Sequence, residues 1–162
     1  MMRIIPFILY LFLIAMHEVI SSDLTTVYTA VINLPALAVL LVATYKSEVV
    51  SIWFGFAAGV VIAAGMPDLM GWHALILSVL GLTAFHVRER LNLDSLYAKL
   101  LLILGGVLVH NVLVLIVTRS DEFLYLLWSR ALVGGILTSL VAWLFFLIKE
   151  GHITYAKMKA LF

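Results

Sequence analysis

Six apolar blocks, each close to the length that crosses a lipid bilayer, constrain this chain more than any other feature. A helix needs about 20 apolar residues to span the hydrocarbon core. The blocks are separated by short polar connections and occupy residues 4–20, 26–45, 49–65, 70–87, 96–117 and 123–148. The pattern predicts an all-α membrane protein with six transmembrane helices.

The composition agrees with this class. Of the 162 residues, 65% are hydrophobic and 12% are charged, whereas soluble domains are about half apolar and a quarter charged. We expect one transmembrane domain, residues 1–148, followed by a cytoplasmic or interfacial tail, residues 149–162, that mixes lysines with apolar residues. No dense basic run indicates nucleic-acid binding, and the absence of cysteine excludes disulfides and Cys-ligated metals.

The first block has a second interpretation. Arg3 precedes it, and Val19-Ile20-Ser21 ends it as the cleavage site of a secretory signal would. We expect a retained transmembrane helix instead.

Basic residues sort between the two sides that six spans define. The termini and connections on one side hold most of them, while the loops of the other side hold Arg119 alone. By the positive-inside rule, both termini are cytoplasmic. The basic residues of the cytoplasmic side are Arg3, Lys46, Arg88, Arg90, Lys99, Lys149, Lys157 and Lys159.

A ridge of small residues marks the third block, where Ser51, Gly55, Gly59 and Ala63 recur every four residues. Such residues share one helix face. Small side chains let another helix backbone approach closely, which is how helices associate in lipid. The sixth block has a similar ridge centred on Gly135. These ridges either pack within the chain, which is their commoner use, or dock the helix of a partner.

Polar and ionisable side chains gather at one depth, in the predicted outer half of the bundle. Such groups are costly in hydrocarbon and indicate function by default. If they converge, Glu18 or Asp68 is the natural ion-pair partner of Arg130. Three roles stay open: hydrogen bonds that pin helix order, a small-molecule pocket open to the outside, and a seat for a membrane segment of another protein. The predicted outer polar layer comprises His17, Glu18, Asn33, Asp68, His73, His110, Asn111 and Arg130.

No catalytic signature is complete. The stretch from His17 to Ser21 begins like the zinc-protease pattern HExxH but has serine where the second ligand must stand. The chain has no Gly-x-Ser-x-Gly elbow, P-loop or GxGxxG motif. Three histidines could meet as metal ligands, but membrane histidines more often form hydrogen bonds. We expect no metal, no cofactor and no enzymatic activity.

Residues 33 to 115 carry a family-like pattern, in which Pro35 leads an apolar helix that ends at Tyr45. Its main motifs are Gly55-Phe56-x-x-Gly59, Leu69-Met70-Gly71-x-His73-Ala74-Leu75, the polar run 88–95, and His110 after Gly105-Gly106. This pattern resembles the rod shape-determining protein MreD family. Many members of that family carry an acidic residue where this chain has Ala63, so the role of that carboxylate is not carried over.

The resemblance implies a non-enzymatic, multi-pass scaffold of the bacterial inner membrane that acts in peptidoglycan synthesis during cell elongation. Its direct partner would be MreC, a single-span protein with an extracytoplasmic domain. Within the elongasome it would act with the RodA glycan polymerase, a class B penicillin-binding transpeptidase and the actin-like MreB filament.

The family fold is similar to the six-helix substrate-binding subunits (S-components) of energy-coupling-factor vitamin transporters. An S-component-like bundle is therefore expected, and a substrate-binding transporter subunit is the alternative function. Against it, the first block lacks the Ala-x-x-x-Ala ridge with which such subunits meet their transport partner.

Overall fold

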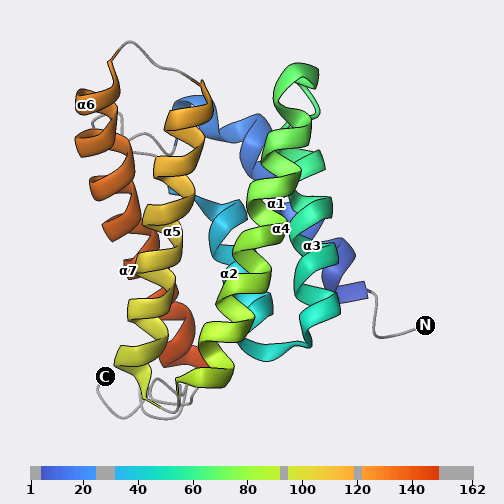
Figure 1. Ribbon diagram of the computed structural model, residues 1–162, viewed down its shortest axis with the longest axis vertical. Helices are drawn as coiled ribbons and strands as arrows, with labels where there is room; N and C mark the ends of the chain where they lie inside the picture. The colour runs from blue at the N-terminus through green and yellow to red at the C-terminus, as the bar shows by residue number, and fades with distance from the viewer. Residues whose placement is uncertain (1–4, 25–31, 92–94, 119–121, 150–162) are drawn as a thin grey trace, which may run out of the picture.

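The computed structural model describes residues 5–24, 32–91, 95–118 and 122–149, and these residues form helices joined by short turns, with no strand among them. The predicted all-α class is confirmed. The last three helical elements, which cover Phe123–Lys149, form one continuous rod (Figure 1). The elements are α1 Ile5–Leu24, α2 Leu34–Tyr45, α3 Glu48–Ile62, α4 Pro67–Arg90, α5 Leu96–Thr118, α6 Phe123–Leu126, the π-helical η1 Leu127–Val133, and α7 Gly134–Lys149. Apart from Lys149, the predicted tail lies outside the described residues.

Three rods are long and apolar enough to cross a membrane: α4, α5 and the continuous rod Phe123–Lys149. The apolar stretches of the other three helices, Ile5–Val19, Leu34–Tyr45 and Glu48–Ile62, are shorter. The structure therefore supports the predicted membrane class with three spans among the described residues. Six crossings and the cytoplasmic position of both termini stay predictions.

The helix α4 is longer at both ends than the predicted block 70–87. It begins at Pro67 because proline suits the first turn, where its missing N–H needs no partner. It continues through Arg88 and Arg90 because basic side chains are favourable in the last turn, at the negative end of the helix dipole. The predicted polar connection is shorter as a result.

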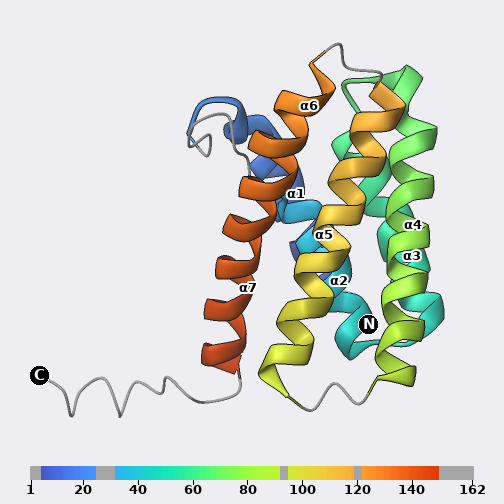
Figure 2. The ribbon, with the colours of Figure 1, turned by 60° about the vertical axis from the view of Figure 1, so that its left-hand side comes forward.

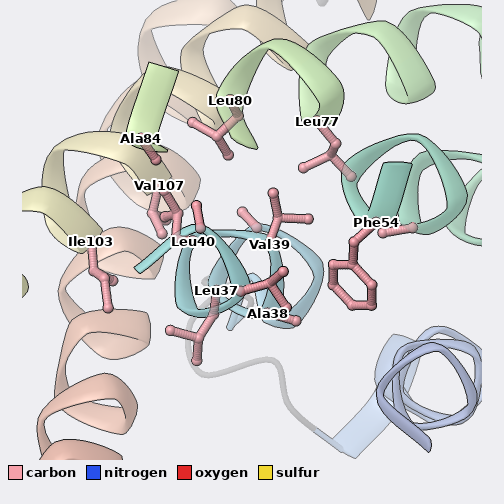
Figure 3. Close-up of a cluster of buried hydrophobic side chains, with 14 of the residues drawn as sticks. Leu37, Ala38, Val39, Leu40, Phe54, Leu77, Leu80, Ala84, Ile103 and Val107 are labelled. Carbon is pink, nitrogen blue, oxygen red and sulfur yellow. The ribbon is translucent and has the colours of Figure 1, made fainter. Parts of the chain in front are cut away.

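The helix α2 forms the centre of the bundle and packs against α1, α3, α4, α5 and α7. It is apolar on all sides, and most of its residues are buried, as expected for a helix enclosed by others. Figure 3 shows its side chains surrounded by those of three neighbouring helices. The labelled core residues are Leu37, Ala38, Val39 and Leu40 of α2, Phe54 of α3, Leu77, Leu80 and Ala84 of α4, and Ile103 and Val107 of α5.

The predicted small-residue ridge of α3 lies against α4 of the same chain. A Cβ atom added at Gly55 would lie 2.3 Å from the Leu77 carbonyl oxygen, and one at Gly59 would lie 2.4 Å from Ala74 Cα. From the other side, a Cβ at Gly81 would lie 2.6 Å from the Ser51 carbonyl oxygen. The two backbones are therefore in direct contact, which larger residues would prevent. In this structure α4 packs on the ridge, which corresponds to the first of its two predicted uses, packing within the chain.

Ala63, the last residue of that ridge, is the C-cap of α3 and is buried. Its carbonyl oxygen accepts a hydrogen bond from the Met66 N–H at 2.9 Å, which closes the predicted turn. In the second ridge, a Cβ at Gly135 would lie 3.0 Å from the Leu108 side chain of α5. Gly135 thus sits at the contact between α7 and α5, which run side by side in Figure 2.

The ends of α2, α4 and α7 and the start of α5 lie at one end of the bundle (Figure 1), and each carries a basic residue. Arg88 Nη1 donates to the carbonyl oxygens of Ala43 and Lys46, each at 2.9 Å, and so caps the end of α2. The Lys149 ammonium lies 3.0 Å from the centroid of the Tyr45 ring. We call Lys46, Arg88, Lys99 and Lys149 the basic end. The turn between α3 and α4 lies at the opposite end.

We expect Gly55→Ala and Gly59→Ala each to destabilise the protein by about 1–3 kcal/mol, the usual cost of overpacking. The added methyl groups would push α4 off α3, since the nearest atoms are backbone and cannot rotate away. Melting temperatures in detergent measure the effect. The matched control is Gly105→Ala, because no atom lies within 4 Å of its added Cβ. Equal melting temperatures for all three variants would show that pushing α4 away from α3 does not destabilise the protein.

Candidate functional site

Asn33 joins three helices through four hydrogen bonds. Its backbone N–H donates to Thr138 Oγ1 of α7 at 2.9 Å, and its side-chain Oδ1 accepts from the Ala36 N–H of α2 at 3.0 Å. Its Nδ2 lies 2.8 Å from His110 Nδ1 and 2.6 Å from Asn111 Oδ1, both on α5. We call Asn33, His110, Asn111 and Thr138 the polar cluster. It ties α2, α5 and α7 together.

The sequence explains why a helix begins inside the bundle at this point. The first backbone N–H groups of a helix have no partner within the helix and need one where water is excluded. Asn33 is the N-cap of α2, and its side chain satisfies the N–H of Ala36. Pro35 lies in the first turn and has no N–H to satisfy. The pair thus removes two of the unpaired donors at the start of α2.

Thr138 is fully buried on α7, and its hydroxyl group forms two hydrogen bonds. Its hydroxyl donates to the Gly134 carbonyl oxygen at 2.6 Å and accepts the backbone N–H of Asn33. The sequence pattern does not indicate Thr138, since a single threonine in an apolar helix usually bonds only to its own backbone. The available signal in the sequence is the pair of glycines before it, since Gly134 and Gly135 are both buried and Gly135 lies at the contact with Leu108 of α5.

The predicted outer polar layer converges only in part. Asn33, His110 and Asn111 form direct hydrogen bonds, whereas among the described residues no hydrogen bond joins His73 of α4 to them. His17 does not join them, since neither of its ring nitrogens has a hydrogen-bond partner among the described residues.

The expected ion pair is not found. Arg130, Glu18 and Asp68 are all exposed, and within the described residues no ion pair joins Arg130 to either carboxyl group. Arg130 belongs to the π-helical η1, whose buried residues are Ser129 and Ala131. Arg130 lies two helical turns into the rod Phe123–Lys149, and a long arginine side chain this near a helix end extends its guanidinium group toward the polar headgroups.

The cluster has the chemistry of a structural polar centre. It consists of two amides, a hydroxyl and an imidazole, without a carboxylate or an ammonium group. Among the residues that the structure describes, no group of three or more His, Asp or Glu side chains is arranged to hold a metal ion. Its hydrogen bonds join α2, α5 and α7, and interhelical bonds in membranes contribute about 0.6 to 2 kcal/mol each.

No protein-family model, curated protein or solved structure matches this chain. A functional proposal therefore depends on the residues and their arrangement.

We expect Asn33→Ala to destabilise the protein by about 2–4 kcal/mol, because it uncaps α2 and removes the Asn33 Nδ2 donor from His110 Nδ1 and Asn111 Oδ1. Asn33→Ser should recover about 1 kcal/mol of this loss, since a serine hydroxyl caps a helix but is too short to reach α5. Melting temperatures in detergent give the order of the variants. Equal values for the alanine and serine variants would show that the cap contributes nothing to stability.

Proposed function

We propose that this protein is a non-enzymatic scaffold of the bacterial inner membrane that binds MreC through its transmembrane surface during cell elongation. RodA, the class B transpeptidase and MreB are its partners at the level of the whole complex. The proposal includes six membrane crossings with the basic end in the cytoplasm. Its starting point is the resemblance to the MreD family.

The observation that carries the proposal is the division of the family-like motifs between two faces of the α3–α4 hairpin. Gly55, Gly59 and Ala74 form the close contact between the two helices, so packing accounts for them. Phe56 and Leu75 belong to the same motifs but remain 47% and 54% exposed, so packing within this chain does not account for them.

These two residues lie on exposed apolar faces of α3 and α4. Residues 53, 56 and 60 share one face of α3, and residues 72, 75 and 79 share one face of α4. Both helices pack against α2 on another side. The exposed faces of the hairpin present large side chains: Trp53, Phe56, Trp72, Leu75 and Val79. A membrane-spanning helix such as that of MreC is a suitable occupant, since rigid aromatic side chains are common anchors at interfaces.

The orientation is supported by the basic end. Lys46, Arg88, Lys99 and Lys149 lie at the ends of four different helices, yet they meet at one end of the bundle (Figure 1). Basic residues are retained on the cytoplasmic side of inner-membrane proteins. Several of them also contact aromatic rings, an arrangement that suits the level of the lipid headgroups.

We expect the double variant Trp72→Ala, Leu75→Ala to lower the amount of MreC captured from co-expressing cells by about tenfold, the effect of losing about 1.4 kcal/mol of binding. The matched control is Trp143→Ala, Leu144→Ala, which removes an exposed tryptophan and leucine from α7. Capture is measured after affinity purification in detergent, with membrane levels of the chain held equal. Undiminished capture by the α4 variant would exclude this surface.

The orientation is testable because the chain has no cysteine of its own. We expect a cysteine at Gly65 to react with a membrane-impermeant maleimide in intact spheroplasts, and a cysteine at Glu89 to react only after permeabilisation. Both positions are exposed, and an added Cβ at Gly65 meets no atom within 4 Å. Labelling of Glu89→Cys from outside would reverse the topology.

A substrate-binding subunit of an energy-coupling-factor transporter is the alternative. The polar cluster favours it, because it lies among helices and includes an unpaired ring nitrogen on His110. Against it, the exposed face of α1 carries large side chains such as Ile8 and Phe12, where a small-residue docking ridge is expected. Capture of the energising module of such a transporter, in place of MreC, would favour this alternative.

A further inference from the structure

Two lysines of the basic end lie against the same pair of aromatic rings. The centroids of the Tyr45 and Phe146 rings are 6.4 Å apart. The Lys149 ammonium lies 3.0 Å from the centroid of the Tyr45 ring, and the Lys99 ammonium lies 5.9 Å from that of Phe146. Contacts between cations and ring faces are favourable. They hold ammonium groups from α5 and α7 beside the end of α2.

The other two cations of the basic end join this place through the backbone of α2. Lys46 directly follows Tyr45, and its carbonyl oxygen accepts a hydrogen bond from Arg88 Nη1 at 2.9 Å. The carboxylates at this end of the described chain are Glu48, in the first turn of α3, and Glu89, near the end of α4. Neither forms an ion pair with Lys46 or Arg88. Cations therefore outnumber carboxylates among the described residues of this end.

Exposed apolar side chains begin directly beside these charges. Lys149 and Phe145 are four residues apart on α7, and the Lys149 ammonium lies 5.5 Å from the Phe145 ring centroid. The adjacent face of α7 presents Ile148 and Leu144, which are 67% and 50% exposed. A ligand that matches both features has an anionic group joined to long apolar chains. A phospholipid has this combination, whereas a nucleic acid or an acidic peptide has no such chains.

We propose that the basic end binds the phosphate group of one anionic phospholipid, such as phosphatidylglycerol, whose acyl chains lie along the exposed face of α7. Lys46 and Lys149 are exposed, and their ammonium groups donate to the phosphate oxygens. Clusters of Lys and Arg at helix ends are the usual recognition sites for anionic headgroups. A zwitterionic headgroup carries an ammonium group of its own and gains less from this charge. The inference depends on the membrane class of the bundle and needs neither MreC nor a particular orientation.

Native mass spectrometry of the full chain in detergent measures the affinity, with phosphatidylglycerol and phosphatidylcholine of identical acyl chains added in separate titrations. We expect the wild-type chain to bind phosphatidylglycerol at least about thirtyfold more tightly. Lys46→Gln and Lys149→Gln should each weaken this binding about fivefold, and the double variant about thirtyfold. Arginine at both positions keeps the charges and should keep the affinity. The matched control is Arg130→Gln, which removes an exposed cation of η1, outside the basic end, and should leave the affinity unchanged.

The wild-type titrations decide the proposal even if a variant does not fold. Equal affinity for the two lipids would overturn it, and so would an equal loss in Arg130→Gln, which would indicate an effect of net charge alone. Glycerophosphoglycerol, the same headgroup without acyl chains, tests the apolar part of the site. Displacement of the lipid by this compound at equal concentration would show that a free phosphodiester is sufficient, and would also overturn the proposal. Capture of MreC is a separate measurement, so either proposal can fail without the other.

Discussion

The bundle depends on the satisfaction of backbone N–H groups at the start of α2. This helix is enclosed by five others, and its first turn, from Pro35 to Leu37, is buried. Unpaired backbone donors are expensive where water is excluded, so the helix needs partners supplied by the protein itself. Asn33 provides them, as the N-cap of α2 and as a donor to α5, while its own N–H is bound by Thr138 of α7. One short polar residue thereby positions three helices.

Close contacts between helix backbones determine how the other helices pack. Lipid does not drive helices together by the hydrophobic effect, so shape complementarity and hydrogen bonds must decide which faces meet. Gly55 and Gly59 admit the backbone of α4, and Gly106 admits the Leu40 side chain of α2. The same contacts explain part of the pattern that resembles the MreD family. Small residues of that pattern are packing residues in this fold, whereas its exposed large residues are the ones free for a partner.

The sequence predicted the helical class and the approximate extent of the helices, because long apolar blocks and turn residues such as Pro67 act locally. It also identified Asn33, His110 and Asn111, because polar groups inside apolar helices stand out. It did not predict Thr138, nor that Arg130 would be exposed, with no ion pair to Glu18 or Asp68 among the described residues. Both depend on which side of a helix faces its neighbours. The π-helical turn around Arg130 rotates the following residues about the helix axis, and no residue pattern in the sequence indicates that turn.

The polar cluster also has a consequence for biogenesis. The groups that complete the start of α2 come from much later in the chain, 77 residues onward at His110 and 105 residues onward at Thr138. A ribosome delivers the chain from its N-terminus, so α2 is made well before these partners. During that interval its first turn has to stay beside water or within the insertion machinery. The final packing of the second helix is therefore one of the last steps of assembly.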